Sequence, residues 1–137
     1  MEPAFCNGQV VPLRHVGDVA RLDIVVFQFP LDPSRDFIKR VIGLPGDKVE
    51  VRRATVFVNG DALNEAYIQD PPNYDYAPKT VPPGMYWVLG DNRRNSFDSH
   101  AWGTSCSPQQ LCDFVPKANL VGLVPPDTKS CRSGAGG

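Results

Sequence analysis

The sequence contains no long hydrophobic run. Apolar stretches such as residues 24–27 have the length of a strand, whereas a membrane-spanning helix needs about 20 apolar residues. The N-terminus also lacks a basic region followed by an apolar one, the pattern of a secretory signal. The chain as given is therefore expected to be soluble.

An excess of one charge sign is also absent. Lysine and arginine total 14 against 15 acidic residues, so the basic footprint of a nucleic-acid-binding protein is missing. The two histidines, His15 and His100, lie far apart, and the cysteines do not follow the common zinc spacings. We therefore expect neither a nucleic-acid partner nor a metal site.

Cysteines are few. Cys106 and Cys112, in a polar loop, could close a small disulfide in an oxidising compartment. Cys6 and Cys131 are expected to be free or incidental.

Proline and glycine are abundant, at 14 and 12 residues, while aromatic residues make up only 9%. This composition favours short strands and many turns over long helices. Strand patterns occur at residues 22–29, 37–42, 48–52, 54–58, 85–89 and 120–124, and Asn59-Gly60 is a strong hairpin signal. Residues 30–34 are expected to form a turn, 61–80 a long loop, and 125–137 a disordered tail. At 137 residues the chain suits one all-β domain, a compact, curved system of antiparallel strands.

One lysine interrupts a strand pattern. Alternation puts Phe37, Lys39 and Val41 on one face of the strand expected at 37–42. Periodicity alone favours an edge lysine whose stem lies on the sheet while its ammonium reaches water. The apolar neighbours favour instead an amine that is partly shielded from water. Burial of this kind can lower the pKa of a lysine by up to roughly 3–5 pH units. Such an amine could act as a general base.

A polar loop follows the aromatic strand at 85–89. It is rich in residues that favour turns, namely Asp91, Asn92, Asn95 and Ser96. The loop could therefore be a turn with no role beyond structure. Beside a buried lysine, the Ser96 hydroxyl could also bond the amine and orient it. Asp91 and Asp98 could pair with a nearby arginine: Arg40, Arg93 or Arg94.

These segments resemble the hallmark segments of type I signal peptidases. The loop motif is Gly90-Asp91-Asn92-Arg93-x-Asn95-Ser96-x-Asp98-Ser99-x-x-Trp102-Gly103, and the lysine-bearing segment is Phe37-Ile38-Lys39-Arg40-Val41-Ile42-Gly43-Leu44-Pro45-Gly46-Asp47. Residues 23–27 and 114–122 are similar to the family's preceding strand and closing stretch. Phe97 and His100 look more like the cyanobacterial and thylakoidal branch. The resemblance implies a catalytic β-sheet domain of the signal peptidase I type over residues 1–124.

The resemblance further implies a serine endopeptidase that removes signal peptides through an acyl-enzyme, without metal or cofactor. Lys39 would be the general base and Ser96 would hold its amine, while Arg40 would pair with Asp91 and Asp98 would stabilise the loop. The pockets for small signal-peptide side chains would involve Met1, Phe5, Val26, Ile38 and Phe97. The partners would be signal peptides of exported preproteins. The implied location is a bacterial plasma membrane or thylakoid membrane, reached through an N-terminal anchor missing from this chain.

The sequence departs from the family at the nucleophile. That serine directly precedes a Met-x-Pro sequence, so Met1-Glu2-Pro3 would place it one position before Met1. Ser34 lies too close to Lys39 along an extended strand to aim back at the amine, and neither Ser96 nor Ser99 is expected to replace it. The chain as given is therefore expected to be inactive. Departures elsewhere include Leu22 where glycine is usual, Arg94 where Asp or Asn is usual, and Ala4 where threonine is usual.

Two other classes compete with this interpretation. A catalytically dead module could bind extended signal peptides by adding a strand to a sheet edge. A serine–lysine self-cleaving repressor domain shares the same pair of residue types, but it usually carries a DNA-binding half, and no basic recognition helix is evident here.

Overall fold

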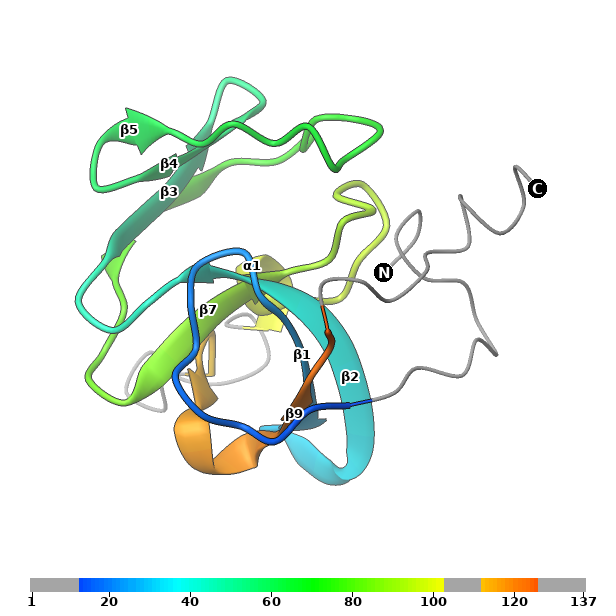
Figure 1. Ribbon diagram of the computed structural model, residues 1–137. Coiled ribbons are helices and arrows are strands. Elements are labelled where there is room, and N and C mark those ends of the chain that lie inside the picture. Colours follow the sequence, from blue (N-terminus) through cyan, green and yellow to red (C-terminus); the bar gives the residue numbers. More distant parts are fainter. Residues whose placement is uncertain (1–12, 103–111, 126–137) are drawn as a thin grey trace.

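The strands form two antiparallel sheets, shown in Figure 1. The computed structural model describes residues 13–102 and 112–125. The larger sheet has the strand order β8-β7-β2-β1-β9, and the smaller has the order β5-β4-β3-β6. The elements are β1 (Ile24–Phe29), β2 (Asp32–Gly43), β3 (Lys48–Arg52), β4 (Thr55–Val58), β5 (Asp61–Ala62), β6 (Tyr76–Thr80), β7 (Met85–Leu89), α1 (Ser99–Trp102), β8 (Val115–Pro116), η3 (Lys117–Asn119) and β9 (Leu120–Leu123). The all-β fold class is confirmed.

The strands β3 and β7 have the predicted bounds, and β1, β4 and β9 differ from them by one or two residues at an end. The strand predicted at 37–42 is longer than expected, since β2 begins five residues earlier and ends one residue later. The turn expected at 30–34 is shorter than predicted, because β2 already begins at Asp32. β7 pairs only with residues 40–43 of β2, whereas β1 pairs with residues 32–40. Within the described chain, the first part of β2 is thus a sheet edge that pairs with β1 alone, and such an edge tolerates Pro33.

The prediction of a long loop over residues 61–80 is wrong at both ends. β5 pairs with β4, and β6 pairs with β3, so this segment contributes two strands to the smaller sheet. Both strands are polar and mostly exposed, which removes the apolar alternation that marks a strand in sequence. The expected system of antiparallel strands divides into two sheets.

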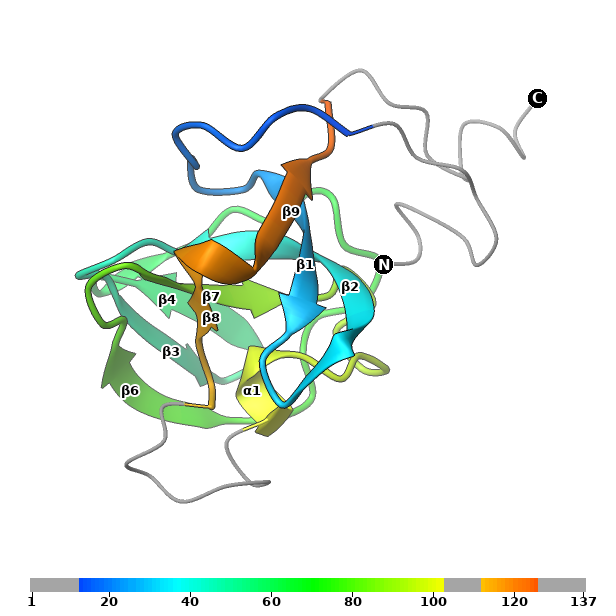
Figure 2. The same ribbon diagram turned by 90° about the horizontal axis from the view of Figure 1, so that it is seen from below.

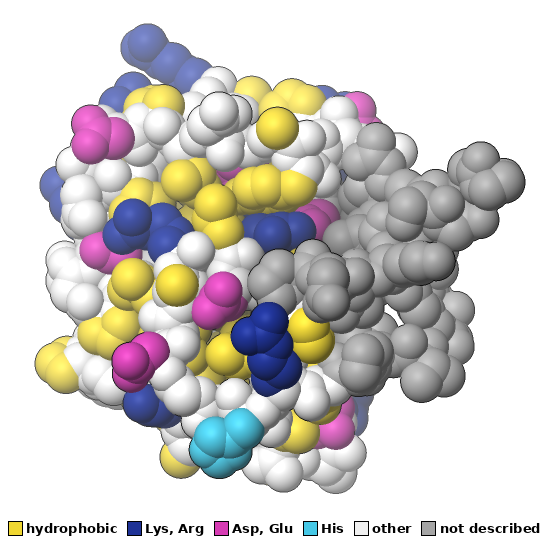
Figure 3. Space-filling view, in the orientation of Figure 1, with side chains coloured by type: hydrophobic (Ala, Val, Ile, Leu, Met, Phe, Trp, Pro, Cys, Tyr) yellow, Lys and Arg dark blue, Asp and Glu magenta, His cyan; other side chains and the backbone are white. Residues whose placement is uncertain are grey.

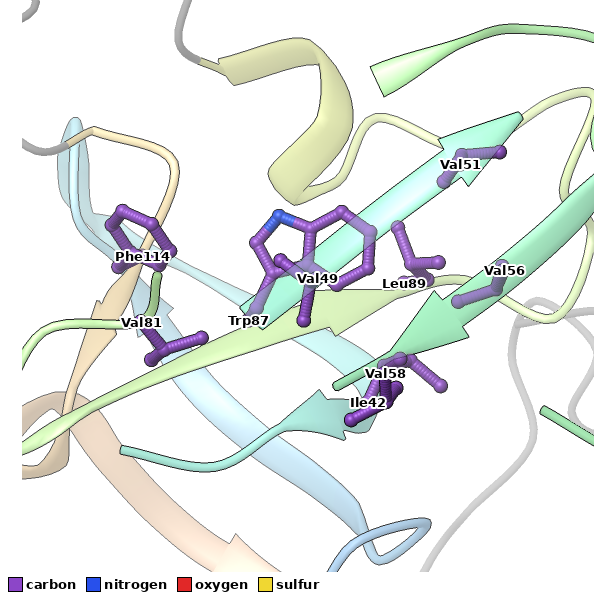
Figure 4. Packing of buried hydrophobic residues seen from close by; sticks show 9 residues of the cluster. All are labelled: Ile42, Val49, Val51, Val56, Val58, Val81, Trp87, Leu89 and Phe114. Atoms are coloured by element: carbon purple, nitrogen blue, oxygen red, sulfur yellow. The ribbon is translucent and has the colours of Figure 1, made fainter. Parts of the chain in front are cut away.

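Two apolar cores flank the larger sheet. The first core joins the two sheets (Figure 4) and consists of Ile42, Val49, Val51, Val56, Val58, Val81, Trp87, Leu89 and Phe114. The second core consists of Val25, Phe27, Phe29, Val41, Tyr86, Val88, Trp102 and Val115. Adjacent residues of β2, Val41 and Ile42, belong to opposite cores, as strand geometry requires. Lys39, two positions before Val41, therefore lies on the face of the second core.

The helix α1 completes the second core. Figure 2 shows it beside the hairpin formed by β1 and β2. Its Trp102 is fully buried and lies edge-on to Phe27, with ring centroids 5.8 Å apart. The helix therefore fixes the end of the polar loop that follows β7.

Turn geometry confirms the hairpin predicted at Asn59-Gly60, where both residues have positive φ, 54° and 87°. Leu22 also has a positive φ of 77°, a region that favours glycine. Its N–H donates to Val41 O at 2.7 Å, so the conformation is fixed by the start of the larger sheet. This explains physically why glycine suits the position.

Figure 3 shows basic, acidic and apolar side chains interspersed on one face of the molecule. The predicted domain limit at residue 124 remains a prediction. The tail predicted at 125–137 lies outside the described residues from 126 onward.

Candidate active site

The Lys39 side chain is positioned by three neighbouring strands. Its Cα lies opposite that of Val25 in β1, whose side chain is fully buried. The register of β2 with β7 pairs Arg40 with Leu89 and Val41 with Val88. Gly90, the next residue after β7, therefore arrives alongside Lys39. The half-buried amine also lies 5.8 Å from the ring centroid of Phe37, so hydrocarbon surrounds much of this side chain.

The loop after β7 places a hydroxyl at this amine. Lys39 Nζ donates to Ser96 Oγ at 3.0 Å. The contact requires glycine at position 90, because a Cβ there would lie 2.0 Å from Ser96 Oγ and 3.4 Å from Lys39 Nζ. Gly90 thus leaves the space in which the pair meets.

Burial lowers the pKa of Lys39 below its ordinary value of 10.5, because removal from water disfavours the ammonium. The negative charges of Asp98 and Asp91 oppose this effect without cancelling it. The amine is therefore easier to deprotonate than a lysine in water, as a general base requires.

Arg40 and Asp91 form a two-pronged ion pair behind the lysine. Arg40 Nε and Nη2 donate to the two carboxylate oxygens at 2.9 and 2.7 Å, and Arg40 Nη1 donates to Leu22 O at 3.1 Å. The Asp91 side chain is fully buried. The pair ties the start of the loop to β2.

Asp98 organises the other end of the loop. Its Oδ2 accepts the Gly90 N–H at 2.9 Å, and its Oδ1 pairs with the ring of His100. Its side-chain partner is therefore the His100 ring, and not one of the arginines considered from sequence. Those side chains bind elsewhere: Arg93 pairs with Glu65, and Arg94 Nε donates to Pro71 O at 3.0 Å.

Sequence and structure comparisons identify the family. Residues 1–125 match the family described as signal peptidase, peptidase S26. The chain belongs to this signal peptidase family.

Relatives span cyanobacteria, plants and other bacteria. The chain is 49% identical over 111 residues to probable signal peptidase I-2 of Synechocystis sp. PCC 6803, covering 77% of this chain and 46% of that protein. It is 42% identical over 110 residues to thylakoidal processing peptidase 1 of Arabidopsis thaliana, covering 73% and 29%. A crystal structure of a signal peptidase I from Enterococcus faecalis V583 matches with a TM-score of 0.66 at 32% identity, covering 81% of this chain and 100% of that one. The chain spans about half the length of the first curated relatives it matches.

The residues expected to bind substrate in this signal peptidase family divide between two faces. Val26 and Ile38 lie opposite one another in β1 and β2, on the face away from Lys39. Phe97 is 46% exposed and packs edge-on against Phe29. Met1 and Phe5 lie outside the described residues.

Other serines of the described chain do not meet the lysine. Ser34 is exposed and donates to Asp32 Oδ1 at 2.6 Å, and the buried Ser99 Oγ accepts the Val88 N–H at 2.9 Å. Ser96 is the hydrogen-bond partner of Lys39 Nζ among residues 13–102 and 112–125.

Cys112 is disulfide-bonded. The other cysteines lie outside the described residues, so the predicted pairing with Cys106 remains a prediction. Within the part of the chain that the structure describes, no three His, Cys, Asp or Glu side chains group as metal ligands. No helix there is long and apolar enough to cross a membrane.

Three functional candidates escaped the sequence reasoning. Gly90 is recognisable from its motif, but its contact with both members of the pair is not. Glu65 and Tyr67 lie in the segment predicted to be a loop, and both contact the arginines around the site. The only local signal of these two residues is their spacing, a glutamate followed two positions later by a tyrosine. The segment around them is polar and contains prolines.

Proposed function

We propose that this chain is the catalytic part of a signal peptidase I, a serine endopeptidase that removes N-terminal signal peptides from exported preproteins. Lys39 is the general base and Ser96 holds its amine. The observation that carries the proposal is the 3.0 Å hydrogen bond from a half-buried amine to a loop hydroxyl. Family membership and the lowered pKa of Lys39 support the same roles.

The proposed nucleophile is a serine one position before Met1. Neutral Lys39 takes the proton from its hydroxyl while the serine oxygen bonds to the scissile carbonyl carbon. The resulting ammonium then returns a proton to the leaving amine as the peptide C–N bond breaks. Water, deprotonated by the same amine, hydrolyses the ester and regenerates the serine hydroxyl.

The proposed substrates carry small side chains at the −1 and −3 positions. Val26 and Ile38, paired across β1 and β2, are proposed to contact these side chains from one face of the sheet and Phe97 from the other. Met1 and Phe5 are proposed as further substrate-binding residues. The proposed location is a plasma or thylakoid membrane, with this domain on the periplasmic or lumenal side. The thylakoidal relative of Arabidopsis supports the thylakoid alternative.

The test is a chain extended at its N-terminus by a segment ending in serine, mixed with a peptide containing Ala-x-Ala. Mass spectrometry should show a single cut after the second alanine. The Lys39→Ala form should be inactive with unchanged circular dichroism, and the Ser96→Ala form should be slower by about tenfold, the worth of one hydrogen bond. Ser34→Ala should match the parent. Binding of the peptide without cleavage would favour the binding module instead.

A further inference from the structure

The guanidinium of Arg93 is buried behind the active-site loop. Its side chain is 0% exposed, and that of its partner Glu65 is 8% exposed. Arg93 Nη1 donates to Glu65 Oε1 at 2.6 Å, while Nη2 forms an ion pair with the second carboxylate oxygen. A buried cation needs such a partner, because desolvation of a lone charge is costly. Glu65 therefore fixes where this guanidinium sits.

Arg93 in turn holds the backbone that contacts the Lys39–Ser96 pair. Its Nε donates to Gly90 O at 2.9 Å, and the Gly90 N–H donates to Asp98 Oδ2 at 2.9 Å. Gly90 is thus held from both sides by buried side chains. Because even a single Cβ at Gly90 would collide with Ser96 Oγ, a small shift of this backbone would change the position of the hydroxyl.

Tyr67 orients the glutamate and covers a second arginine. Its hydroxyl donates to Glu65 Oε2 at 2.7 Å. Its ring centroid lies 4.0 Å from the Arg40 guanidinium carbon and 5.9 Å from that of Arg93. The connection between β5 and β6, close to the loop after β7 in Figure 1, thus contacts both arginines that anchor that loop.

We propose that Glu65, oriented by Tyr67, is a positioning residue for the Lys39–Ser96 pair and acts through Arg93 and Gly90. Its relevance to turnover rests on the proposed function, but its effect on the amine can be measured without turnover. If Glu65 only tied the β5–β6 connection to the domain, its loss would lower stability and leave the amine unchanged.

The test is the pKa of the Lys39 amine, followed by NMR in the 137-residue chain with labelled lysine. In Glu65→Gln the Arg93 guanidinium loses its counter-charge, Gly90 and Ser96 shift, and water reaches the amine. We expect the pKa of Lys39 to rise by about one pH unit toward that of free lysine. Loss of the negative charge of Glu65, by itself, would lower the pKa of Lys39. A rise in this pKa would therefore show that Gly90 and Ser96 have moved relative to the amine. Glu50→Gln removes the surface ion pair with Arg52 and is the matched control, with Lys39 unchanged.

An unchanged or lowered pKa of Lys39 in Glu65→Gln would overturn the proposal, whatever the melting temperature. If that variant does not fold, Tyr67→Phe decides, because it removes the hydroxyl and keeps the ring. It should raise the pKa in the same direction by a smaller amount, and no change would again overturn the proposal. In the serine-extended chain, Glu65→Gln should lower kcat about tenfold or more with little change in KM. An inactive extended parent would count against the proposed function, while the pKa measurement would still decide the role of Glu65.

Discussion

The amine of Lys39 and the hydroxyl of Ser96 lie 3.0 Å apart, although 57 positions separate them in the chain. Pairing of β2 with β7 brings them together, since the register leaves Gly90 beside Lys39 as the loop begins. The loop then returns over the amine, with Asp98 bonded to the Gly90 N–H. The sheet thus sets the position of the base, and the buried carboxylates set the position of its partner.

Replacing Lys39 with methionine should stabilise the protein. Burial lowers the pKa of Lys39 in the folded protein below its ordinary value of 10.5, so the unfolded chain binds the lysine proton more tightly than the folded one. At a pH below both pKa values, the charged amine therefore destabilises the folded state. The free energy of unfolding rises again as the pH increases from the folded-state pKa to 10.5. We expect Lys39→Met to be more stable than the parent in urea unfolding at pH 7, with the gain shrinking toward pH 10.5. Lys48→Met, at an exposed position of β3, should show no such trend, and a trend shared by both variants would contradict the assignment.

The pH dependence of turnover should report the same amine. Only neutral Lys39 can accept a proton, so kcat/KM of the serine-extended chain should rise with pH and level off above the pKa of the free enzyme's base. That midpoint should lie below 10.5, in the direction to which burial moves the lysine. Steady-state assays across the pH range would measure it. A midpoint equal to that of free lysine would argue against a buried base.

Adding one methyl group at Gly90 should disrupt the pair. The Cβ of Gly90→Ala would lie 2.0 Å from Ser96 Oγ, so the loop must move, at a cost of about 1–3 kcal/mol. Thermal unfolding would measure the loss, and NMR would show a changed Lys39 environment. Gly17→Ala is the matched control, because nothing lies within 4 Å of its added Cβ. Equal stability of the two variants would refute the close approach.

Arg40→Met should be strongly destabilising, because it leaves the buried Asp91 carboxylate without its guanidinium. Loss of one partner of such a pair costs about 3–5 kcal/mol. Denaturant unfolding of Arg40→Met, Asp91→Leu and the double variant would form a double-mutant cycle. We expect the double variant to recover part of the loss. Strictly additive single effects would show that the ion pair contributes nothing to stability.

Much of this site could be predicted from the sequence, because the residues that indicate it are neighbours along the chain. The apolar residues flanking Lys39 predict a partly dry amine, and the turn formers before Ser96 predict a tight loop. The partners that span longer distances are less visible. Glu65 reads as an ordinary surface acid in a polar segment, and its buried arginine lies 28 positions away. No local pattern distinguishes a glutamate that pairs inside the protein from one that faces water.

Predictions failed where tertiary contacts decide the outcome. Asp98 had three arginines as sequence candidates, yet the short helix α1 turns His100 back onto it. β6 is almost entirely exposed and polar, so only its pairing with β3 reveals a strand. At Leu22 the positive φ follows from the bond of its N–H to Val41 in β2, which a strand pattern starting at residue 22 does not anticipate.

The backbone N–H of Gly90 donates to Asp98, whose side chain is fully buried, and Gly90 itself is buried. Although this amide belongs to a loop, it can exchange its hydrogen for deuterium only when the surrounding ion pairs open. It should therefore exchange as slowly as the central strands.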